Sequence, residues 1–398
     1  MVYLSTVVSS MLTTLFFIFA ILMIGYFIGS FEYKGIGLGD AGVLLIALIF
    51  GIIANNVGSF EIGGKTIELF NTTTIKSMYS FVSNIGTAMF VTAVGLIAGP
   101  KFFRYFNKDS VSYLVMGFVI IALGVITTVI VKFVSGIEMD LAVGLMTGAL
   151  TSTPGLSGAM EVAQDADAVT AGYGIAYLFG VLGVVFFVQL MPKILHTDIA
   201  AEREKYKALA GVKGLEFKRK VRKIDDLDFF PFFLTVVAGM MLGRLYIPGI
   251  NFSLGTAGGS LVMGLIVGHF GHIGSIDLRV SKSTLNFFRE LGLVLFLVGA
   301  GVPGGVNFIK YVSPMLFVYG AIMTIVPMIA GFFLGKYVFK LDIFNNLGSI
   351  TGGMTSTPAL GTLIHTAGTD EVSGAYAATY PIALVFVTLA AKALVMFL

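Results

Sequence analysis

A polar tetrapeptide occurs twice in a strongly apolar chain. Thr151-Ser152-Thr153-Pro154 lies within residues 148–156, and the same four residue types return within residues 352–360. Six of the nine aligned positions are identical, and the two copies are 204 residues apart. Each hydroxyl can donate or accept a hydrogen bond, so two such motifs brought together would form a polar site for a small molecule.

Each Thr-Pro pair predicts a break in a helix. Proline disrupts a helix interior but suits the first turn, where its missing N–H is not needed. The preceding Thr153 or Thr357 is then expected to cap the new helix with its hydroxyl. We therefore predict that a short helix ends near the first Thr of each motif and that another begins at Pro154 or Pro358.

The two breaks would carry partial charges that suit a small ion. A helix N-terminus presents free N–H groups and about half a positive charge, so two together suit a carboxylate without a buried arginine. The freed carbonyls of the first arms would suit a cation or an ammonium group. Close packing of small residues is the alternative explanation, but the duplication favours a substrate site. The residues predicted to bind substrate are Thr151, Ser152, Thr153, Pro154, Gly155, Thr355, Ser356, Thr357, Pro358 and Ala359.

Two matched pairs of polar residues are candidates for selectivity or coupling. Glu161 and His365 each follow their motif proline by seven residues. We expect them at a water-facing interface, and the alternative is that they gate the site or carry a proton. Asn84 and Glu290 match at the start of a third span, where Glu290 is expected to pair with Arg289 at headgroup level. If that span begins deeper, the two would face the breaks and help to select substrate.

Other residue types narrow the function by their position or absence. Lys392, near the end of the last span, is expected to snorkel to the surface. His269 and His272 lack carboxylate neighbours, so no metal site is predicted. The sequence has no cysteine, no Walker loop, no Gly-x-Ser-x-Gly and no His-Glu-x-x-His. We therefore expect no enzyme and no cofactor, beyond Na⁺ or H⁺ as a coupling ion.

Composition places the chain in a membrane. Of its 398 residues 57% are hydrophobic and 12% are charged, and the mean hydropathy is +0.94. A soluble chain would carry about twice that charge. The net charge is +3 and its basic excess lies in one linker, so nucleic-acid binding is not expected. The first apolar run lacks a basic leader and a cleavage site, and we interpret it as a retained span.

Apolar runs of spanning length divide the chain into two copies. We predict repeat 1 at 1–195, a charged linker at 196–228 and repeat 2 at 229–398. Gly25-x3-Gly29 matches Gly239-x3-Gly243 between the copies, and Tyr173 and Tyr177 match Tyr376 and Tyr380. The predicted spans are 11–29, 41–57, 84–100, 111–134 and 171–191, then 230–247, 257–272, 290–306, 312–335 and 372–397, with re-entrant hairpins at 140–165 and 344–368.

Five spans plus one hairpin per copy would insert the second copy upside down. The linker has nine Lys and Arg residues, which place it in the cytoplasm, with both termini outside the cell membrane. In the short loops, eight Lys and Arg residues fall on the predicted inner side and five on the outer side. This modest bias favours the predicted topology but leaves a topology with six spans per copy as an alternative. The eight predicted inside are Lys34, Lys101, Arg104, Lys108, Arg279, Lys282, Lys336 and Lys340, and the five outside are Lys65, Lys76, Lys132, Arg244 and Lys310.

The two motifs and the duplicated spans around them resemble the aspartate:alanine exchanger family of bacterial secondary transporters. The resemblance implies exchange of small carboxylates or amino acids, such as aspartate, alanine or succinate. The helical plan is similar to that of glutamate:sodium and citrate:sodium symporters, which implies an elevator movement and a homodimer. Members of the family typically carry a large soluble region between the halves, whereas this chain has only residues 196–228 there.

Inverted repeats with matching broken helices are a recurring plan for secondary transporters. The leading hypothesis is therefore an antiporter for a small anionic or zwitterionic substrate such as a dicarboxylate. A sodium- or proton-coupled symporter of the same architecture is the first alternative. A gated channel for small anions is the second.

Overall fold

The fold is described from a computed structural model. It covers residues 13–398 apart from 34–35, 38–40, 63–64, 70–72, 103–110, 210–221, 248–251 and 370–371. Several basic residues used for the topology prediction lie outside these described residues, namely Lys34, Arg104, Lys108, Lys213, Lys218, Arg219 and Lys220.

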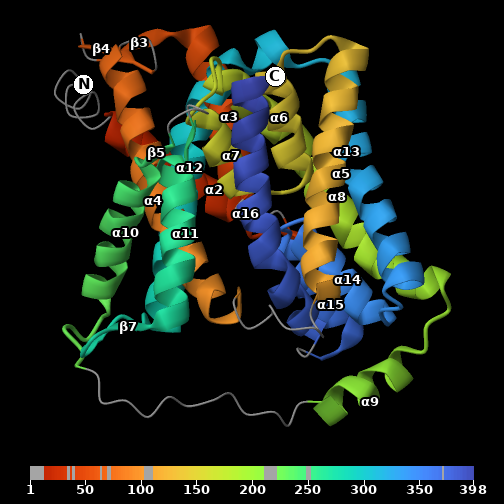
Figure 1. The fold of residues 1–398 in the computed structure, drawn as a ribbon. Helices are drawn as coiled ribbons and strands as arrows, with labels where there is room; N and C mark the ends of the chain where they lie inside the picture. Colours follow the sequence, from red (N-terminus) through yellow and green to blue (C-terminus); the bar gives the residue numbers. More distant parts are fainter. Residues whose placement is uncertain are drawn as a thin grey trace.

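Helices follow one another in the same order in the two halves (Figure 1). The first half contains α2 (Thr14–Gly29), α3 (Ala41–Val57), α4 (Thr73–Phe102), α5 (Val111–Ser135), α6 (Met139–Ala149), α7 (Thr153–Met160) and α8 (Ala166–Ile194). The second contains α10 (Phe229–Gly243), α11 (Gly255–Phe270), α12 (Lys282–Tyr311), α13 (Pro314–Phe333), the π-helical turn η3 (Leu334–Val338), α14 (Ile343–Gly353), α15 (Thr357–Ala367) and α16 (Ser373–Phe397).

Short antiparallel β-hairpins join the first helices of each half. Each hairpin is a separate two-stranded sheet. The strands are β1 (Glu32–Tyr33) with β2 (Ile36–Gly37), β3 (Ser59–Ile62) with β4 (Lys65–Glu68), β5 (Tyr246–Ile247) with β6 (Phe252–Ser253), and β7 (His272–Ile273) with β8 (Ile276–Asp277).

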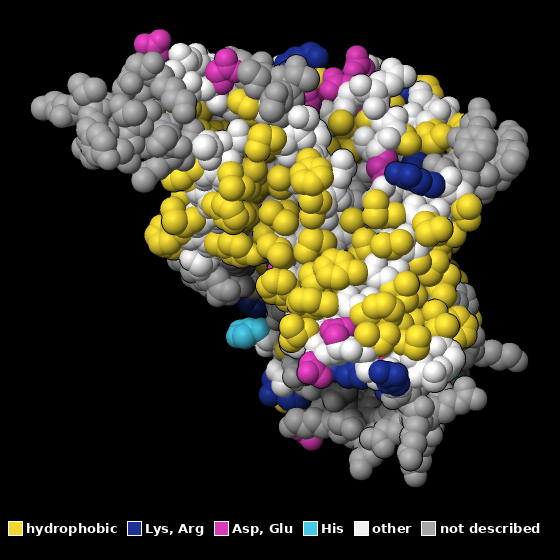
Figure 2. Space-filling view, turned by 90° about the vertical axis from the view of Figure 1, so that its left-hand side faces the viewer, with side chains coloured by type: hydrophobic (Ala, Val, Ile, Leu, Met, Phe, Trp, Pro, Cys, Tyr) yellow, Lys and Arg dark blue, Asp and Glu magenta, His cyan; other side chains and the backbone are white. Residues whose placement is uncertain are grey.

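The predicted helical, multi-pass membrane architecture is confirmed. In the described part of the chain, six helices are long and apolar enough to cross a membrane, within α4, α5, α8, α12, α13 with η3, and α16. The shorter α2, α3, α10 and α11 have 15 to 17 residues. Figure 2 shows a broad band of hydrophobic side chains between two ends that carry most of the charge, as expected of a surface that faces lipid.

The third long helix of each half begins earlier than predicted. α4 and α12 each have 30 residues and start at Thr73 and Lys282. Their first turns contain polar residues, which lowered the hydropathy on which the predicted starts at 84 and 290 depended. Asn84 and Glu290 therefore lie inside these helices, and their predicted place at the start of a span is wrong.

Glycines allow α4 and α12 to touch along their backbones. A methyl group added to Gly86 would lie 2.3 Å from the backbone nitrogen of Phe296, and one added to Gly292 would lie 2.4 Å from that of Phe90. With α2, α3, α10 and α11, these two helices form what we call the outer group. Only residues without a side chain permit an approach this close.

A second group of helices carries the broken pairs, and we call it the inner group. It consists of α5 to α8 and α13 to α16. Methyl groups on Gly144 and Gly148 of α6 would meet the carbonyl oxygens of Val169 and Tyr173 on α8, at 2.2 and 2.4 Å. Gly352 on α14 takes the corresponding position against α16. In Figure 1, α4, α10 and α11 lie to the left, and α5, α8 and α13 lie to the right.

The linker contacts both helix groups at one end of the molecule. Its helix α9 (Ile199–Leu209) lies beneath α14 and α15 in Figure 1, and Arg203 Nε donates to the carbonyl oxygen of Ala367 at 2.8 Å. Arg222 N donates to Ser275 O at 2.7 Å, between β7 and β8. Lys223 pairs with Asp228 at 2.8 Å, and this hydrogen bond raises the pKa of Lys223.

Substituting Gly292 with Ala should destabilise the protein by about 1–3 kcal/mol, because the methyl group would push α12 away from α4. Gly361→Ala is the matched control, since a methyl group there would have no atom within 4 Å and would favour the helix. Thermal unfolding of the purified variants in detergent measures both. Equal unfolding temperatures for Gly292→Ala and wild type would show that the two backbones are not in contact.

Candidate functional site

The two helix breaks lie side by side and bond to each other. The first break separates α6 from α7 at Leu150 to Ser152, and the second separates α14 from α15 at Met354 to Ser356. Thr151 Oγ1 donates to Met354 O at 2.8 Å, and Thr355 Oγ1 donates to Leu150 O at 2.8 Å. Each break therefore satisfies a carbonyl group that the other has freed.

Both threonines adopt an unusual backbone conformation. The φ angle is +52° at Thr151 and +50° at Thr355. The left-handed region costs an ordinary L-residue roughly 1–2 kcal/mol, and a β-branched residue is rarely found there. Such a conformation persists only where the surroundings fix it. Here, the two reciprocal hydrogen bonds provide part of that constraint.

Serine, not threonine, occupies the N-cap position of each second arm. Ser152 precedes α7, and its Oγ accepts from Gly155 N at 3.1 Å. The predicted capping role of Thr153 is wrong, because the helix begins at Thr153 and places Pro154 second. Thr153 Oγ1 instead lies 3.2 Å from the hydroxyl of Tyr173 on α8.

The second break follows the same register. Ser356 precedes α15, so the predicted cap at Thr357 is wrong as well. The side chains of Thr357 and Pro358 lie outside the described residues. Ala359, like Gly155 in the first copy, is buried.

Tyrosine pairs flank the two breaks in matching positions. The rings of Tyr173 and Tyr177 on α8 lie 5.1 Å apart, and those of Tyr376 and Tyr380 on α16 lie 4.9 Å apart. The duplication aligned these pairs, but sequence alone did not assign the Thr153–Tyr173 contact. The tyrosine rings provide an apolar surface beside the breaks, and their hydroxyl groups can form hydrogen bonds there.

Among the described residues, neither Asn84 nor Glu290 forms a hydrogen bond with the breaks. Asn84 is exposed, and Glu290 pairs with the neighbouring Arg289, whose Nε lies 3.1 Å away. The residue of α4 that does reach a hairpin is Thr87, which accepts from Ser157 of α7 at 3.2 Å. Thr87 lies three positions after Asn84, and sequence reasoning missed it because a lone Thr in an apolar helix gives no distinct signal.

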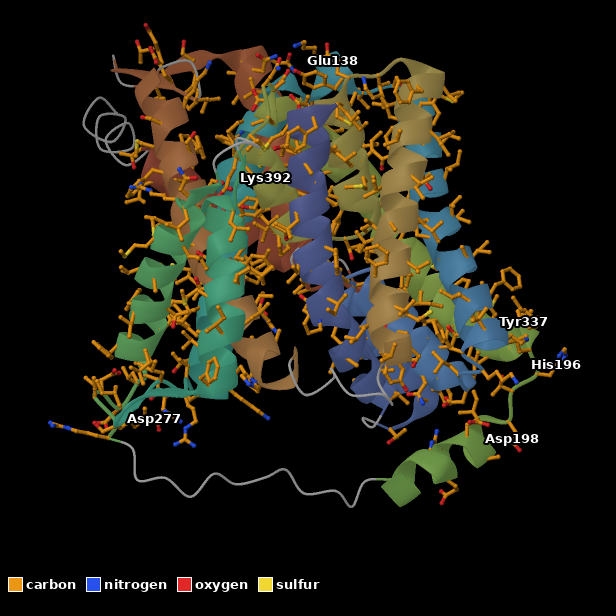
Figure 3. All side chains as sticks on the ribbon, in the orientation of Figure 1. Glu138, His196, Asp198, Asp277, Tyr337 and Lys392 are labelled. Carbon is orange, nitrogen blue, oxygen red and sulfur yellow. The ribbon has the colours of Figure 1, made fainter. Side chains whose placement is uncertain are left out.

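Glu161 joins the end of the first hairpin to two other helices. Its Oε1 accepts from Ala257 N in the first turn of α11 at 2.8 Å, and its Oε2 lies 3.3 Å from Lys392 Nζ on α16. Lys392 is only 2% exposed, so the prediction that it snorkels to the surface is wrong. Figure 3 shows Lys392 within the helical body, whereas the other five labelled residues lie near its two ends. His365, the partner of Glu161 in the duplication, is exposed on α15.

Gly255 makes room for this ion pair. Its φ angle is +69°, and a methyl group there would lie 1.7 Å from Glu161 Oε2 and 2.4 Å from Lys392 Nζ. The carboxylate also sits at the N-terminus of α11, whose partial positive charge favours an anion. Such extra partners offset the desolvation of the pair, in which Lys392 is buried and Glu161 is partly exposed. Among the described residues, no cluster of three or more His, Asp and Glu could hold a metal ion.

Lys392→Met should destabilise the fold by about 1–3 kcal/mol, because it leaves the partly exposed carboxylate of Glu161 with only the Ala257 N–H as a partner. Adding Glu161→Gln to that variant should recover part of the loss, since a neutral amide oxygen still accepts from Ala257 N. Thermal unfolding of the single and double variants gives the coupling between the two residues.

Lys132→Met supplies the control for this double-mutant cycle, because Lys132 lies in the last turn of α5 and has no ion pair among the described residues. If the losses in unfolding free energy for Lys392→Met and Glu161→Gln are strictly additive in the double variant, the two residues do not form a stabilising pair.

The sequence matches one family over most of its length. A family described as a predicted permease membrane region, the aspartate:alanine exchanger type, matches residues 17–193 and 231–396. The stretch left unmatched between these two segments corresponds to the linker.

Curated relatives align with nearly the whole chain at low identity. An uncharacterized transporter of Bacteroides fragilis (strain YCH46) is 26% identical over 94% of this chain and 96% of its own length. Uncharacterized transporters of Rhodopirellula baltica and Desulfotalea psychrophila are each 24% identical, over 94% and 96% of this chain and 98% and 96% of their own lengths. The first alignment runs over 538 positions, so that relative contains segments that these 398 residues lack. The chain therefore belongs to the aspartate:alanine exchanger family of membrane transporters.

Proposed function

We propose that the protein is a secondary active transporter that exchanges small carboxylates or carboxylate-bearing amino acids. The observation that carries this proposal is the reciprocal pair of hydrogen bonds from Thr151 and Thr355. They bring the starts of α7 and α15 together inside the protein. Family membership supports transport, and aspartate, alanine and dicarboxylates are the substrates that the family resemblance suggests.

The charge at the paired breaks favours an anionic group. Each helix start contributes about half a positive charge, and two adjacent starts reinforce one another in a low-dielectric interior. Hydroxyls of Ser152, Thr153 and Ser356 are buried beside them. A carboxylate could therefore leave water without a lysine or arginine partner.

Exchange is better supported than sodium-coupled symport. The freed carbonyls of the first arms were predicted to suit a cation or an ammonium group, and Leu150 and Met354 supply two of them. Both already accept a threonine hydroxyl, so they are less available to a cation. Symport remains the second candidate, with the cation held elsewhere.

The two helix groups support an elevator movement. The inner group contains both breaks and would move as one body against the outer group. Among the described residues, the polar contacts that cross between the groups include Ser157 with Thr87, Glu161 with Ala257 N and Asp165 with Tyr311. In Figure 1 the first hairpin lies in the upper half and the second in the lower half, which supports inverted repeats.

The same arrangement supports the proposed topology. Helix α9 and the strands β7 and β8 lie at one end of the molecule, and the end of α16 lies at the other (Figure 1). We place the linker in the cytoplasm on the strength of its nine basic residues. A homodimer is proposed from the family resemblance.

Counterflow in proteoliposomes tests the proposed exchange. Uptake of labelled aspartate or succinate should require internal unlabelled substrate, saturate with concentration and ignore an imposed sodium gradient. Uptake that follows the sodium gradient without internal substrate would favour symport. Flux that does not saturate would indicate a channel.

Thr151→Val and Thr355→Val should each reduce exchange at least tenfold. Each removes one reciprocal hydrogen bond and leaves a buried carbonyl unpaired, at a cost of about 1–3 kcal/mol. Thr128→Val is the matched control, because Thr128 is also buried but bonds only to Gly124 O in its own helix, at 2.8 Å. If the two motif variants exchange substrate at the same rate as Thr128→Val, the breaks are not part of the transport site.

A further inference from the structure

The two capping serines have the same backbone geometry. Ser152 has φ −97° and ψ 94°, and Ser356 has φ −92° and ψ 95°. Their backbone N–H groups donate to equivalent carbonyls, those of Thr147 at 2.8 Å and Thr351 at 2.9 Å. Both serines are fully buried. A difference between their side chains is therefore not caused by the path of the chain.

The hydroxyls nevertheless differ in what they contact. Ser152 Oγ accepts from Gly155 N at 3.1 Å and closes the start of α7. Helix α15 has no such side-chain cap, and Ser356 Oγ is buried with no hydrogen-bond partner among the described residues. Buried polar groups in native proteins are nearly always bonded, and an exception calls for an explanation such as a ligand or a solvent molecule.

One sequence difference lies at the open cap. The third residue of α7 is Gly155, and a methyl group there would lie 3.1 Å from Ser152 Oγ and 3.0 Å from Thr147 Cγ2. The third residue of α15 is Ala359, which has that methyl group. The side chain of Ala359 therefore leaves less space for a serine cap in the second copy than Gly155 leaves in the first.

Resting on the function proposed above, we propose that the substrate carboxylate binds at the second break. The Ser356 hydroxyl donates to one carboxylate oxygen, and the uncapped N–H of Ala359 is available to donate as well. The first break is closed by Ser152 and supports the second through the Thr151 and Thr355 hydrogen bonds. The two copies of the motif thus have different roles.

The test compares three variants of the full chain by binding and by thermal unfolding. Aspartate and succinate are titrated calorimetrically onto detergent-purified protein. Ser356→Ala should weaken binding at least tenfold with an unfolding temperature equal to or above that of wild type, because it removes an unpaired buried hydroxyl. Ser152→Ala should lower the unfolding temperature and weaken binding less than threefold.

Ala359→Gly should separate the two roles further. It gives the Ser356 hydroxyl more space, so this hydroxyl should turn to cap α15 and carboxylate binding should weaken. Ser349→Ala is the neutral control, since Ser349 bonds only to Asn345 O within α14, at 2.8 Å.

Three results would overturn the proposal. They are unchanged affinity in Ser356→Ala, equal loss of affinity in Ser152→Ala and Ser356→Ala, and absence of carboxylate binding to the wild-type protein. A wild-type protein that binds a carboxylate but fails to exchange it would refute the proposed exchange and leave the binding site standing.

Discussion

The structure depends on one constraint, which is that a helix broken inside a membrane must satisfy the backbone groups it frees. Thr151 and Thr355 do this for each other's hairpin through two 2.8 Å hydrogen bonds. No water or lipid is needed at these two carbonyls, and neither hairpin can satisfy them alone. The left-handed conformation of both residues is the accompanying strain. The breaks therefore stabilise each other as a pair.

Close backbone packing around the breaks is achieved with glycine, and a charged pair lies at the end of the first hairpin. Glycines of α6 and α14 allow these arms to lie against α8 and α16. Gly255 leaves room for Glu161 and Lys392, which join α7, α16 and the start of α11. At the end of the first hairpin, where the two helix groups touch, close glycine packing and an ion pair therefore occur together.

Sequence analysis predicted the helical membrane architecture, because apolar runs of spanning length and the Thr-Pro helix break are local patterns that occur in both copies. It placed Asn84 and Glu290 wrongly, since polar first turns hide the start of α4 and α12 from a hydropathy window. It also assigned the N-caps to Thr153 and Thr357, one residue too late in each copy. The position of the cap depends on the left-handed conformation of Thr151 and Thr355, which the sequence does not reveal. The pairing of Lys392 with Glu161 spans 231 positions, and no local pattern announces it.

The linker is attached at both of its described ends, and this sets a limit on mechanical travel. Arg203 holds α9 to the end of α15, and Arg222 is paired with the β7–β8 loop beside the outer helices. The fourteen residues from Leu209 to Arg222 are joined by thirteen peptide bonds and reach at most about 45 Å when fully extended. This segment of the linker connects the second hairpin to the outer group. Its length therefore limits how far the inner group could move past the outer group in the proposed elevator movement while both contacts are kept.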